Sequence, residues 1–174
     1  STSFYIRGYE DCISRIIHCT YHITLYTFEF CGCYFYSMEF DLCEAMKRTA
    51  ETPFPQTDLK HMLYQILSAV SHIHEKWYLH RDLKTSNILV HKSGRLCVCD
   101  FGLARKYQNP LKALTQLVIT LWYRPPELLF GETVYGPEVD IWSIGCIFAE
   151  LITKKALLQG SGELDQIDKV ILLS

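Results

Sequence analysis

The sequence lacks what a membrane-spanning or secreted protein needs. It contains no uncharged apolar run of eighteen residues; residues 141–152 come closest, and Glu150 interrupts them. An apolar stretch of that length is typical of a buried core helix. The amino-terminal residues also lack a positively charged stretch followed by an apolar one, so no secretory leader is expected. We therefore expect no membrane contact and an intracellular location.

A charge excess of one sign and a disulfide framework are also absent. The 17 Lys and Arg residues against 19 Asp and Glu give a formal net charge of −2, so no nucleic-acid footprint is indicated. Eight cysteines occur, and without a leader they are expected to be reduced thiols. Two Cys-x-Cys pairs, Cys31/Cys33 and Cys97/Cys99, leave zinc as an alternative. Cys97 and Cys99 alternate along an expected strand, where small apolar residues suffice.

Two short strings carry the strongest signal. Residues 80–87 read His-Arg-Asp-Leu-Lys-Thr-Ser-Asn, and residues 100–102 read Asp-Phe-Gly. Between them, the apolar runs 88–90 and 96–99 flank a polar segment, which predicts a β-hairpin. Because a hairpin folds back on itself, Asn87 and Asp100 are expected to lie close enough to share a metal ion. The alternative is a surface loop that is charged by coincidence.

These strings resemble the catalytic loop and the metal-binding turn of protein kinases. Residues 100–105, 120–127 and 140–147 are similar to the cyclin-dependent kinase family, and residues 84–87, 109–112 and 164–167 are most similar to its PITSLRE-type branch. The similarity runs from about Tyr34 to Val170, with Pro125 where the family usually has alanine. It implies an α+β fold with a mostly helical large lobe and a reduced or degenerate β small lobe.

The resemblance implies a role for each residue of the expected site. Asp82 would accept or orient the proton of a substrate hydroxyl, Lys84 would contact the γ-phosphate of ATP, and Thr120 would bridge the two. Asn87 and Asp100 would hold Mg²⁺. The adenine would bind a hinge and an apolar floor, which correspond to Met38, Glu39, Phe40, Asp41 and Leu89.

Further positions bear on regulation and specificity. Thr115 matches the activation-loop threonine that this family phosphorylates, and its phosphate would pair with Arg81 and Arg105. Asp140 would brace the backbone of the catalytic loop, and residues 122–124 would shape a pocket that favours proline after the phosphoacceptor. Without the resemblance, the alternatives are that Thr115 is an unmodified loop threonine, Arg105 a solvated cation and Asp140 an acidic residue favoured at a helix N-terminus.

Periodicity adds a coarse map of the large lobe. Thr57 is expected to cap a helix whose apolar residues keep helical spacing up to Trp77. Residues 139–152 are expected to form a central buried helix. Residues 108–119, the activation segment, show no periodicity and are expected to be a loop.

Parts of the family's small lobe are missing from the sequence. No lysine precedes Lys47, so the strand lysine that anchors the ATP phosphates is absent. Residues 15–23 resemble a worn glycine-rich loop in which Ile17, Cys19 and His22 replace glycines. Leu42 follows the hinge where relatives have additional residues, and the helix that contacts a cyclin is not found.

The carboxy-terminal part is expected to be short as well. The family continues through further helices after residues 164–167, and this sequence stops at Ser174. Glu127 is expected to be a buried carboxylate whose arginine partner belongs to that missing region. We divide the chain into a degenerate small-lobe remnant with the hinge at 1–40 and a partial large lobe at 41–174.

Three interpretations stay open. The first is a serine/threonine kinase of cyclin-dependent type that transfers the γ-phosphate of Mg-ATP to Ser/Thr-Pro protein substrates, with a cyclin partner whose docking helix is missing here. The second is a catalytically impaired pseudokinase or interaction module. The third is a kinase fragment that does not function alone. Family analogy implies the nucleus, with the cytoplasm as the alternative.

Overall fold

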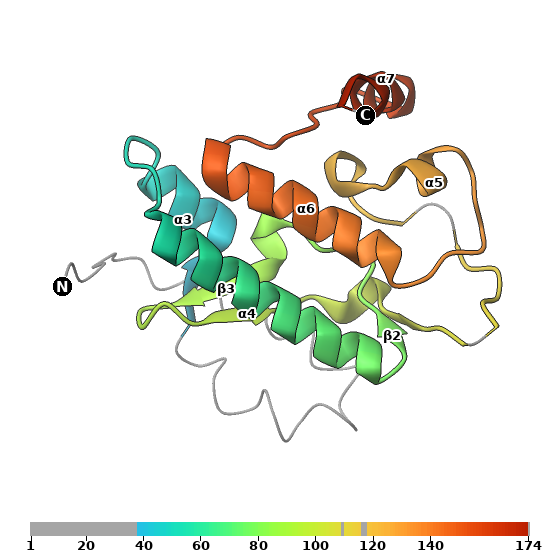
Figure 1. Ribbon diagram of the computed structural model, residues 1–174, viewed down its shortest axis with the longest axis horizontal. Coiled ribbons are helices and arrows are strands. Elements are labelled where there is room, and N and C mark those ends of the chain that lie inside the picture. Colours follow the sequence, from blue (N-terminus) through green and yellow to red (C-terminus); the bar gives the residue numbers. More distant parts are fainter. Residues whose placement is uncertain (1–37, 109, 116–117, 174) are drawn as a thin grey trace.

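Helices predominate in the part of the chain that the structure describes. The structure is a computed structural model, and it describes residues 38–108, 110–115 and 118–173. Within these residues the strands form two small antiparallel sheets (Figure 1). The expected α+β class with a mostly helical large lobe is therefore confirmed. Cys31, Cys33 and residues 15–23 lie outside the described residues, as does most of the 1–40 division.

The larger sheet is built on the predicted hairpin. β3 (Ile88–His91) pairs antiparallel with β4 (Leu96–Val98). β1 (Met38–Asp41) pairs antiparallel with the other side of β3, which gives the order β1-β3-β4. Gly94 closes the hairpin with φ of +83°, a backbone conformation that residues with a Cβ rarely adopt. The hairpin thus sets the two expected metal ligands at its open end.

The side chain of Gln65 covers the outer edge of β4. Its Nε2 donates to the carbonyl oxygen of Gly94 at 3.1 Å, and its Oε1 accepts from the backbone N–H of Leu96 at 2.9 Å. One side-chain amide therefore presents the donor and the acceptor that a neighbouring strand would offer. Gln65 projects from α4 (Gln56–Glu75), which packs against β4.

The boundaries of α4 differ from those expected. The helix begins at Gln56 after Pro55, and no side chain caps it, so the expected cap at Thr57 is wrong. Proline fixes the backbone just before the first turn, and Thr57 already lies inside that turn. The helix ends at Glu75 rather than Trp77, because Trp77 has φ of +64° and a left-handed residue cannot continue a right-handed helix.

The central helix is α6 (Glu138–Thr153), and its predicted position is confirmed. It packs beside α4, and Figure 1 shows the two long helices running across the body of the molecule. Its buried apolar side chains are Val139, Ile144, Cys146, Ile147 and Leu151. Lys154, with φ of +60°, ends the helix.

Short elements connect this framework. Asp41 caps α3 (Leu42–Arg48) by accepting from the backbone N–H of Glu44 at 2.8 Å. The other elements are β2 (Tyr78–Leu79), which pairs with β5 (Arg105–Lys106), α5 (Pro126–Leu129), α7 (Glu163–Leu173), and the 3₁₀ turns η2 (Thr85–Asn87), η3 (Phe101–Leu103) and η4 (Leu121–Tyr123). α7 packs against α5 and η4 at one end of the molecule.

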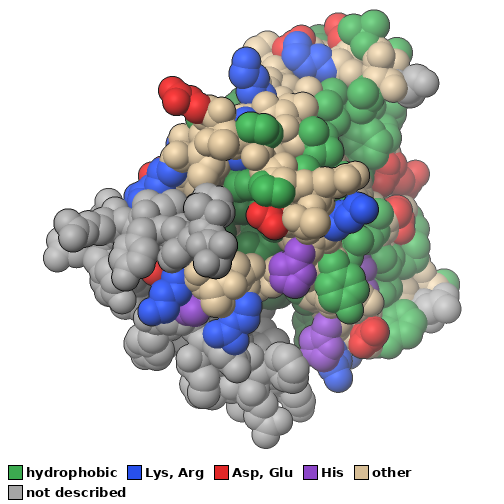
Figure 2. Space-filling view, turned by 60° about the vertical axis from the view of Figure 1, so that its left-hand side comes forward, with side chains coloured by type: hydrophobic (Ala, Val, Ile, Leu, Met, Phe, Trp, Pro, Cys, Tyr) green, Lys and Arg blue, Asp and Glu red, His purple; other side chains and the backbone are tan. Residues whose placement is uncertain are grey.

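The exposure of one acidic side chain differs from the expectation. Glu127 was expected to be a buried carboxylate, but it is only partly buried and lines an open groove with Glu132 and Glu138. Acidic and basic side chains are interspersed on the face that Figure 2 presents. Within the described ranges, every helix is too short or too polar to cross a membrane.

Candidate active site

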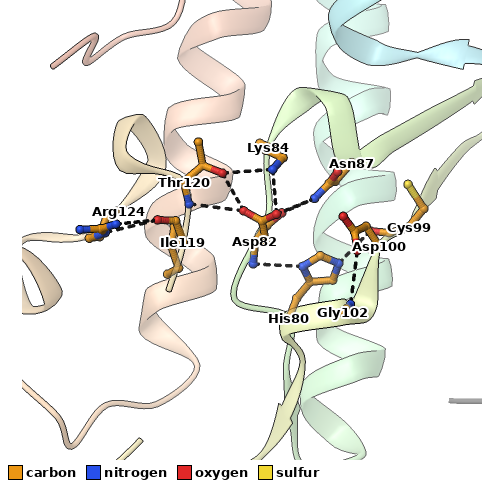
Figure 3. A network of polar contacts seen from close by, with 10 residues as sticks. All are labelled: His80, Asp82, Lys84, Asn87, Cys99, Asp100, Gly102, Ile119, Thr120 and Arg124. Carbon is orange, nitrogen blue, oxygen red and sulfur yellow. Dashed lines mark hydrogen bonds and ion pairs between the residues drawn. The ribbon is translucent and has the colours of Figure 1, made fainter. Parts of the chain in front are cut away.

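The carboxylate of Asp82 is held from several sides by the residues that the sequence singled out (Figure 3). Its Oδ1 accepts from Thr120 Oγ1 at 2.8 Å, and its Oδ2 accepts from Lys84 Nζ at 2.8 Å and Asn87 Nδ2 at 3.0 Å. Lys84 Nζ also donates to Thr120 Oγ1 at 3.1 Å. With 7% of Asp82 exposed, the orientation of its carboxylate is fixed by these bonds.

A second carboxylate holds the backbone of the catalytic loop. Asp140 is 0% exposed; its Oδ1 accepts from the backbone N–H of Arg81 and its Oδ2 from that of His80, both at 2.9 Å. Arg81 has φ of +66°, a strained conformation that needs such support. The structure thus bears out the bracing role expected for Asp140. Sequence reasoning missed His74, whose Nε2 lies 2.8 Å from Asp140 Oδ2, because no local pattern reports a contact 66 residues away.

His80 links the catalytic loop to the Asp-Phe-Gly turn. Its Nδ1 accepts from the backbone N–H of Asp82 at 3.3 Å, so its Nε2 carries the proton and donates to the carbonyl of Cys99 at 3.0 Å. Burial lowers the pKa of His80, which favours this neutral imidazole. The ring also meets Phe101 edge-on, with centroids 4.8 Å apart.

Asn87 and Asp100 lie at the open end of the hairpin, as expected. The backbone N–H of Cys99 donates to the carbonyl of Asn87 at 2.9 Å, which joins the two ends. Asn87 Nδ2 donates to both the backbone oxygen (2.8 Å) and the carboxylate of Asp82, so the Oδ1 of Asn87 is the atom that can serve a cation. Asp100 has φ of +61° and an exposed side chain.

The side-chain oxygens of Asn87 and Asp100 fit Mg²⁺ rather than a metal that needs many protein ligands. Within the described residues, no three His, Cys, Asp or Glu side chains are grouped so as to hold a metal ion. Mg²⁺ binds through one or two carboxylates and takes its other ligands from phosphate and water. One carboxylate beside one amide oxygen matches that requirement.

The expected adenine-binding residues share one sheet. Met38, Glu39, Phe40 and Asp41 form β1, and Leu89 lies in β3, opposite Asp41 in the register. Leu89 is 5% exposed. The carboxylate of Asp41 caps α3 through its Oδ1. Their role in binding adenine stays a prediction.

The expected regulatory residues are partly brought together. Thr115 is exposed, and its carbonyl accepts from the hydroxyl of Tyr135, which in turn accepts from Arg81 Nη1 at 2.8 Å. Arg105 Nη1 donates to the carbonyl of Ala104 at 2.8 Å, and among the described residues no hydrogen bond joins Arg105 to Thr115. The structure therefore connects Thr115 with Arg81, through a tyrosine that sequence reasoning missed.

Sequence reasoning also missed the backbone of Ile119. Its φ is +66°, which is an outlier for a β-branched residue, and it is 3% exposed. The guanidinium of Arg124 holds its carbonyl oxygen, with Nη2 at 3.1 Å and Nε at 3.3 Å (Figure 3). Arg124 Nη1 reaches Glu163 on α7 at 2.9 Å. Positive φ at a non-glycine residue leaves no signature in the sequence.

A buried carboxyl lies beneath the site. Glu150 on α6 accepts from the hydroxyl of Tyr123 at 2.7 Å and from Thr85 Oγ1 at 3.2 Å. Burial raises the pKa of Glu150, and the two hydrogen bonds oppose that shift. Burial raises the pKa of Tyr123 as well, so its hydroxyl stays a donor. Thr85 follows Lys84 in the catalytic loop, so this carboxyl joins the loop to the segment that carries Thr120.

Comparisons with known proteins agree with this geometry. The family model of the protein kinase domain matches residues 13–173 of this chain. Cyclin-dependent kinase 11 of Dictyostelium discoideum is 50% identical over 142 residues, which are 80% of this chain and 39% of that protein. Cyclin-dependent kinase 11B of Homo sapiens is 53% identical over 133 residues, 76% of this chain and 17% of that protein. Cyclin-dependent kinase G-1 of Oryza sativa subsp. indica is 50% identical over 133 residues, 76% of this chain and 19% of that protein.

The chain therefore spans well under half the length of these curated relatives. Its resemblance to the PITSLRE-type branch, drawn from residues 84–87, 109–112 and 164–167, is confirmed by the relatives that share it. Together with the family match over nearly the whole sequence and the arrangement around Asp82, they show that the chain belongs to the protein kinase family, in its cyclin-dependent branch.

Proposed function

We propose that this chain contributes the catalytic half of a serine/threonine protein kinase of cyclin-dependent type. The reaction is transfer of the γ-phosphate of Mg-ATP to a serine or threonine hydroxyl that is followed by proline. The observation that carries this proposal is the carboxylate of Asp82, oriented by Thr120, Lys84 and Asn87.

Each residue of the site has a definite task in this reaction. Mg-ATP, when bound, supplies the phosphoryl group and neutralises the charge that spreads over its oxygens. Asp82 orients the substrate hydroxyl and takes its proton. Lys84, which is partly exposed, offers a cation beside Asp82, and Asn87 and Asp100 would hold the metal. Positioning and charge stabilisation of this kind provide most of the catalysis in phosphoryl transfer.

The test combines nucleotide binding with phosphate transfer. Saturating Mg-ATP should raise the unfolding temperature of the chain, because a ligand at about a hundredfold excess over Kd stabilises the folded state by about 2.7 kcal/mol. Transfer to a Ser-Pro peptide should disappear in Asp82→Asn and persist in Asp168→Asn, a matched change at an exposed residue of α7. Transfer that survives Asp82→Asn would refute the role of Asp82.

The preference for proline is proposed from Ile119 and Arg124. Ile119 precedes Thr120, which contacts Asp82, so the residue after the phosphoacceptor would pass nearby. Because Arg124 already donates two hydrogen bonds to the carbonyl oxygen of Ile119, that oxygen would not be free to accept from a substrate N–H. Most residues would leave their N–H unpaired there, at about 1–3 kcal/mol, whereas proline has no N–H to satisfy.

A matched pair of peptides measures this preference. A Ser-Pro peptide should exceed its Ser-Ala counterpart in kcat/KM by roughly 10- to 100-fold, which corresponds to the unpaired N–H. Arg124→Lys, which cannot grip the carbonyl with two nitrogens, should reduce the ratio. A ratio that is the same in wild type and variant would contradict the assignment.

Regulation and partners follow the branch by analogy. Phosphorylation of Thr115 would add close to two negative charges beside Arg81, with Arg105 as a second candidate cation. A cyclin partner, protein substrates and a nuclear location are proposed on the same analogy, since the relatives are named cyclin-dependent kinases. The small-lobe remnant at 1–40 and the partial large lobe at 41–174 remain our proposed division.

One observation favours a catalytically impaired interaction module as the second candidate. Residues 1–46 of this chain contain no lysine that could anchor the ATP phosphates. Without such a cation, which contributes several kcal/mol, transfer by these residues alone should be slower by on the order of a hundredfold or more. A chain that unfolds cooperatively, ignores Mg-ATP and still binds a partner after Asp82→Asn would support this second function. Absence of any cooperative unfolding transition would instead support the interpretation that the chain is a kinase fragment that does not function alone.

A further inference from the structure

The part of the activation segment before Thr115 rests on the loop that leads into α6. The backbone N–H of Leu114 donates to the carbonyl of Thr133 at 2.8 Å. One residue on, the carbonyl of Thr115 accepts from the hydroxyl of Tyr135 at 2.5 Å. The Leu114 side chain also packs against the hydrophobic core. Two consecutive residues of the segment are therefore fastened to one loop.

Tyr135 is placed between the segment and the catalytic loop. It is 1% exposed, and its single hydroxyl hydrogen goes to Thr115, while its oxygen accepts from Arg81 Nη1 at 2.8 Å. Arg81 is 2% exposed, and its Nε donates to the carbonyl of Leu103 at 2.9 Å. The hydroxyl thus uses both its donor and one acceptor position to join two parts of the chain.

We propose that Tyr135 is a positioning residue that fastens the activation segment to Arg81 through the backbone of Thr115. This inference rests on the proposed function, because it concerns the regulation of the same site. Arg81 precedes Asp82, so the Tyr135 bridge ties the position of Thr115 to the residue beside the reacting hydroxyl. A phosphate on Thr115 would add a second link to a segment that Tyr135 already holds.

The bridge can be removed by deleting one oxygen atom. Tyr135→Phe keeps the ring and its packing but loses both hydrogen bonds, so the segment should open more often. Trypsin cleavage after the exposed Lys112 should become about tenfold faster at native conditions, which corresponds to a bridge of about 1.4 kcal/mol. Cleavage after Lys155, exposed beyond α6, is the internal control and should not change.

A second variant separates the bridge from the phosphate-accepting side chain. Thr115→Ala removes the hydroxyl but keeps the backbone carbonyl that Tyr135 binds, so cleavage after Lys112 should match wild type. Equal rates for Tyr135→Phe and wild type would overturn the proposal, as would parallel acceleration at Lys112 and Lys155, because that would report a loss of overall stability.

Hydrogen exchange in the wild-type chain gives a test that needs no variant to fold. The amide of Leu114 should be protected in the unphosphorylated protein, since the bridge holds the neighbouring residue in place. Exchange of that amide at the rate of an unstructured peptide would also overturn the proposal. Neither cleavage nor exchange requires phosphate transfer, so a chain that fails every kinase assay can still retain the bridge.

Discussion

Asp140 provides the most demanding test of how the catalytic loop is held. In Asp140→Ala, the backbone N–H groups of His80 and Arg81 lose their only acceptor in the described structure, and both residues are buried. Each unsatisfied buried donor costs about 1–3 kcal/mol, and hydrogen bonds to a charged acceptor lie at the upper end of the range. The His74 contact and the strained Arg81 add to this loss.

We therefore expect Asp140→Ala to lower the free energy of unfolding by roughly 3–6 kcal/mol. This is a large part of the total, because domains are typically stable by only about 5–15 kcal/mol. Asp140→Asn should lose nearly as much, since one carboxylate oxygen becomes an N–H₂ group that faces a backbone N–H. Retention of the side-chain volume would then not rescue the fold.

Urea unfolding followed by tryptophan fluorescence measures the effect. With a slope of about 2 kcal/mol per molar urea, the midpoint should fall by roughly 1.5–3 M. Asp168→Asn, at an exposed position of α7, is the matched control and should stay within about 0.5 kcal/mol of wild type. If the free energy of unfolding of Asp140→Asn lay within about 1 kcal/mol of the wild-type value, the hydrogen bonds of Asp140 would not hold the catalytic loop as we argue.

Three further changes test other parts of the framework. Gly145 lies exposed within α6, and an added Cβ would meet no atom within 4 Å, so Gly145→Ala should raise the free energy of unfolding by about 0.5–1 kcal/mol in the same urea assay. Burial raises the pKa of Glu150, so its neutral form is favoured in the folded chain. The contribution of Glu150 to stability is therefore complete at pH values below the pKa of an unfolded glutamate. That contribution is lost as the pH rises through the higher pKa of the folded chain. The stability of Glu150→Gln should accordingly increase relative to wild type as pH rises between these two pKa values. A difference in unfolding midpoint that stays constant with pH would contradict the raised pKa of the buried Glu150. Burial also lowers the pKa of Lys154 to about 8, so its ¹³Cε resonance should titrate near that pH. Wild type should gain stability over Lys154→Met as pH rises above 8, because the unfolded chain then binds more protons than the folded chain.

The sequence predicted the elements whose signals are local. The hairpin between Asn87 and Asp100 follows from alternating apolar and turn residues, and α6 follows from a nearly continuous apolar stretch. The grouping of Asp82 with Lys84 and Thr120 was predicted by resemblance, and the structure shows the same contacts. Motifs of this kind are informative because each residue type is needed for one task.

The contacts that were not predicted depend on tertiary structure. His74, Tyr135 and Glu150 meet their partners only after distant segments have packed, so no spacing along the sequence reveals them. The left-handed backbone of Ile119 was also invisible, because the strain is imposed by Arg124 and by burial rather than by local propensity. The expected cap at Thr57 failed for the opposite reason: a local preference was overruled by the preceding proline.

The amide of Gln65 also has a consequence for how copies of this chain can associate. An open strand edge is a template on which another strand can add, and such edges are common starting points for aggregation. Because Gln65 occupies the free donor and acceptor of the segment around Gly94 and Leu96, an incoming strand would first have to displace it. One side chain from a helix thus protects the catalytic hairpin from sheet growth on the β4 side.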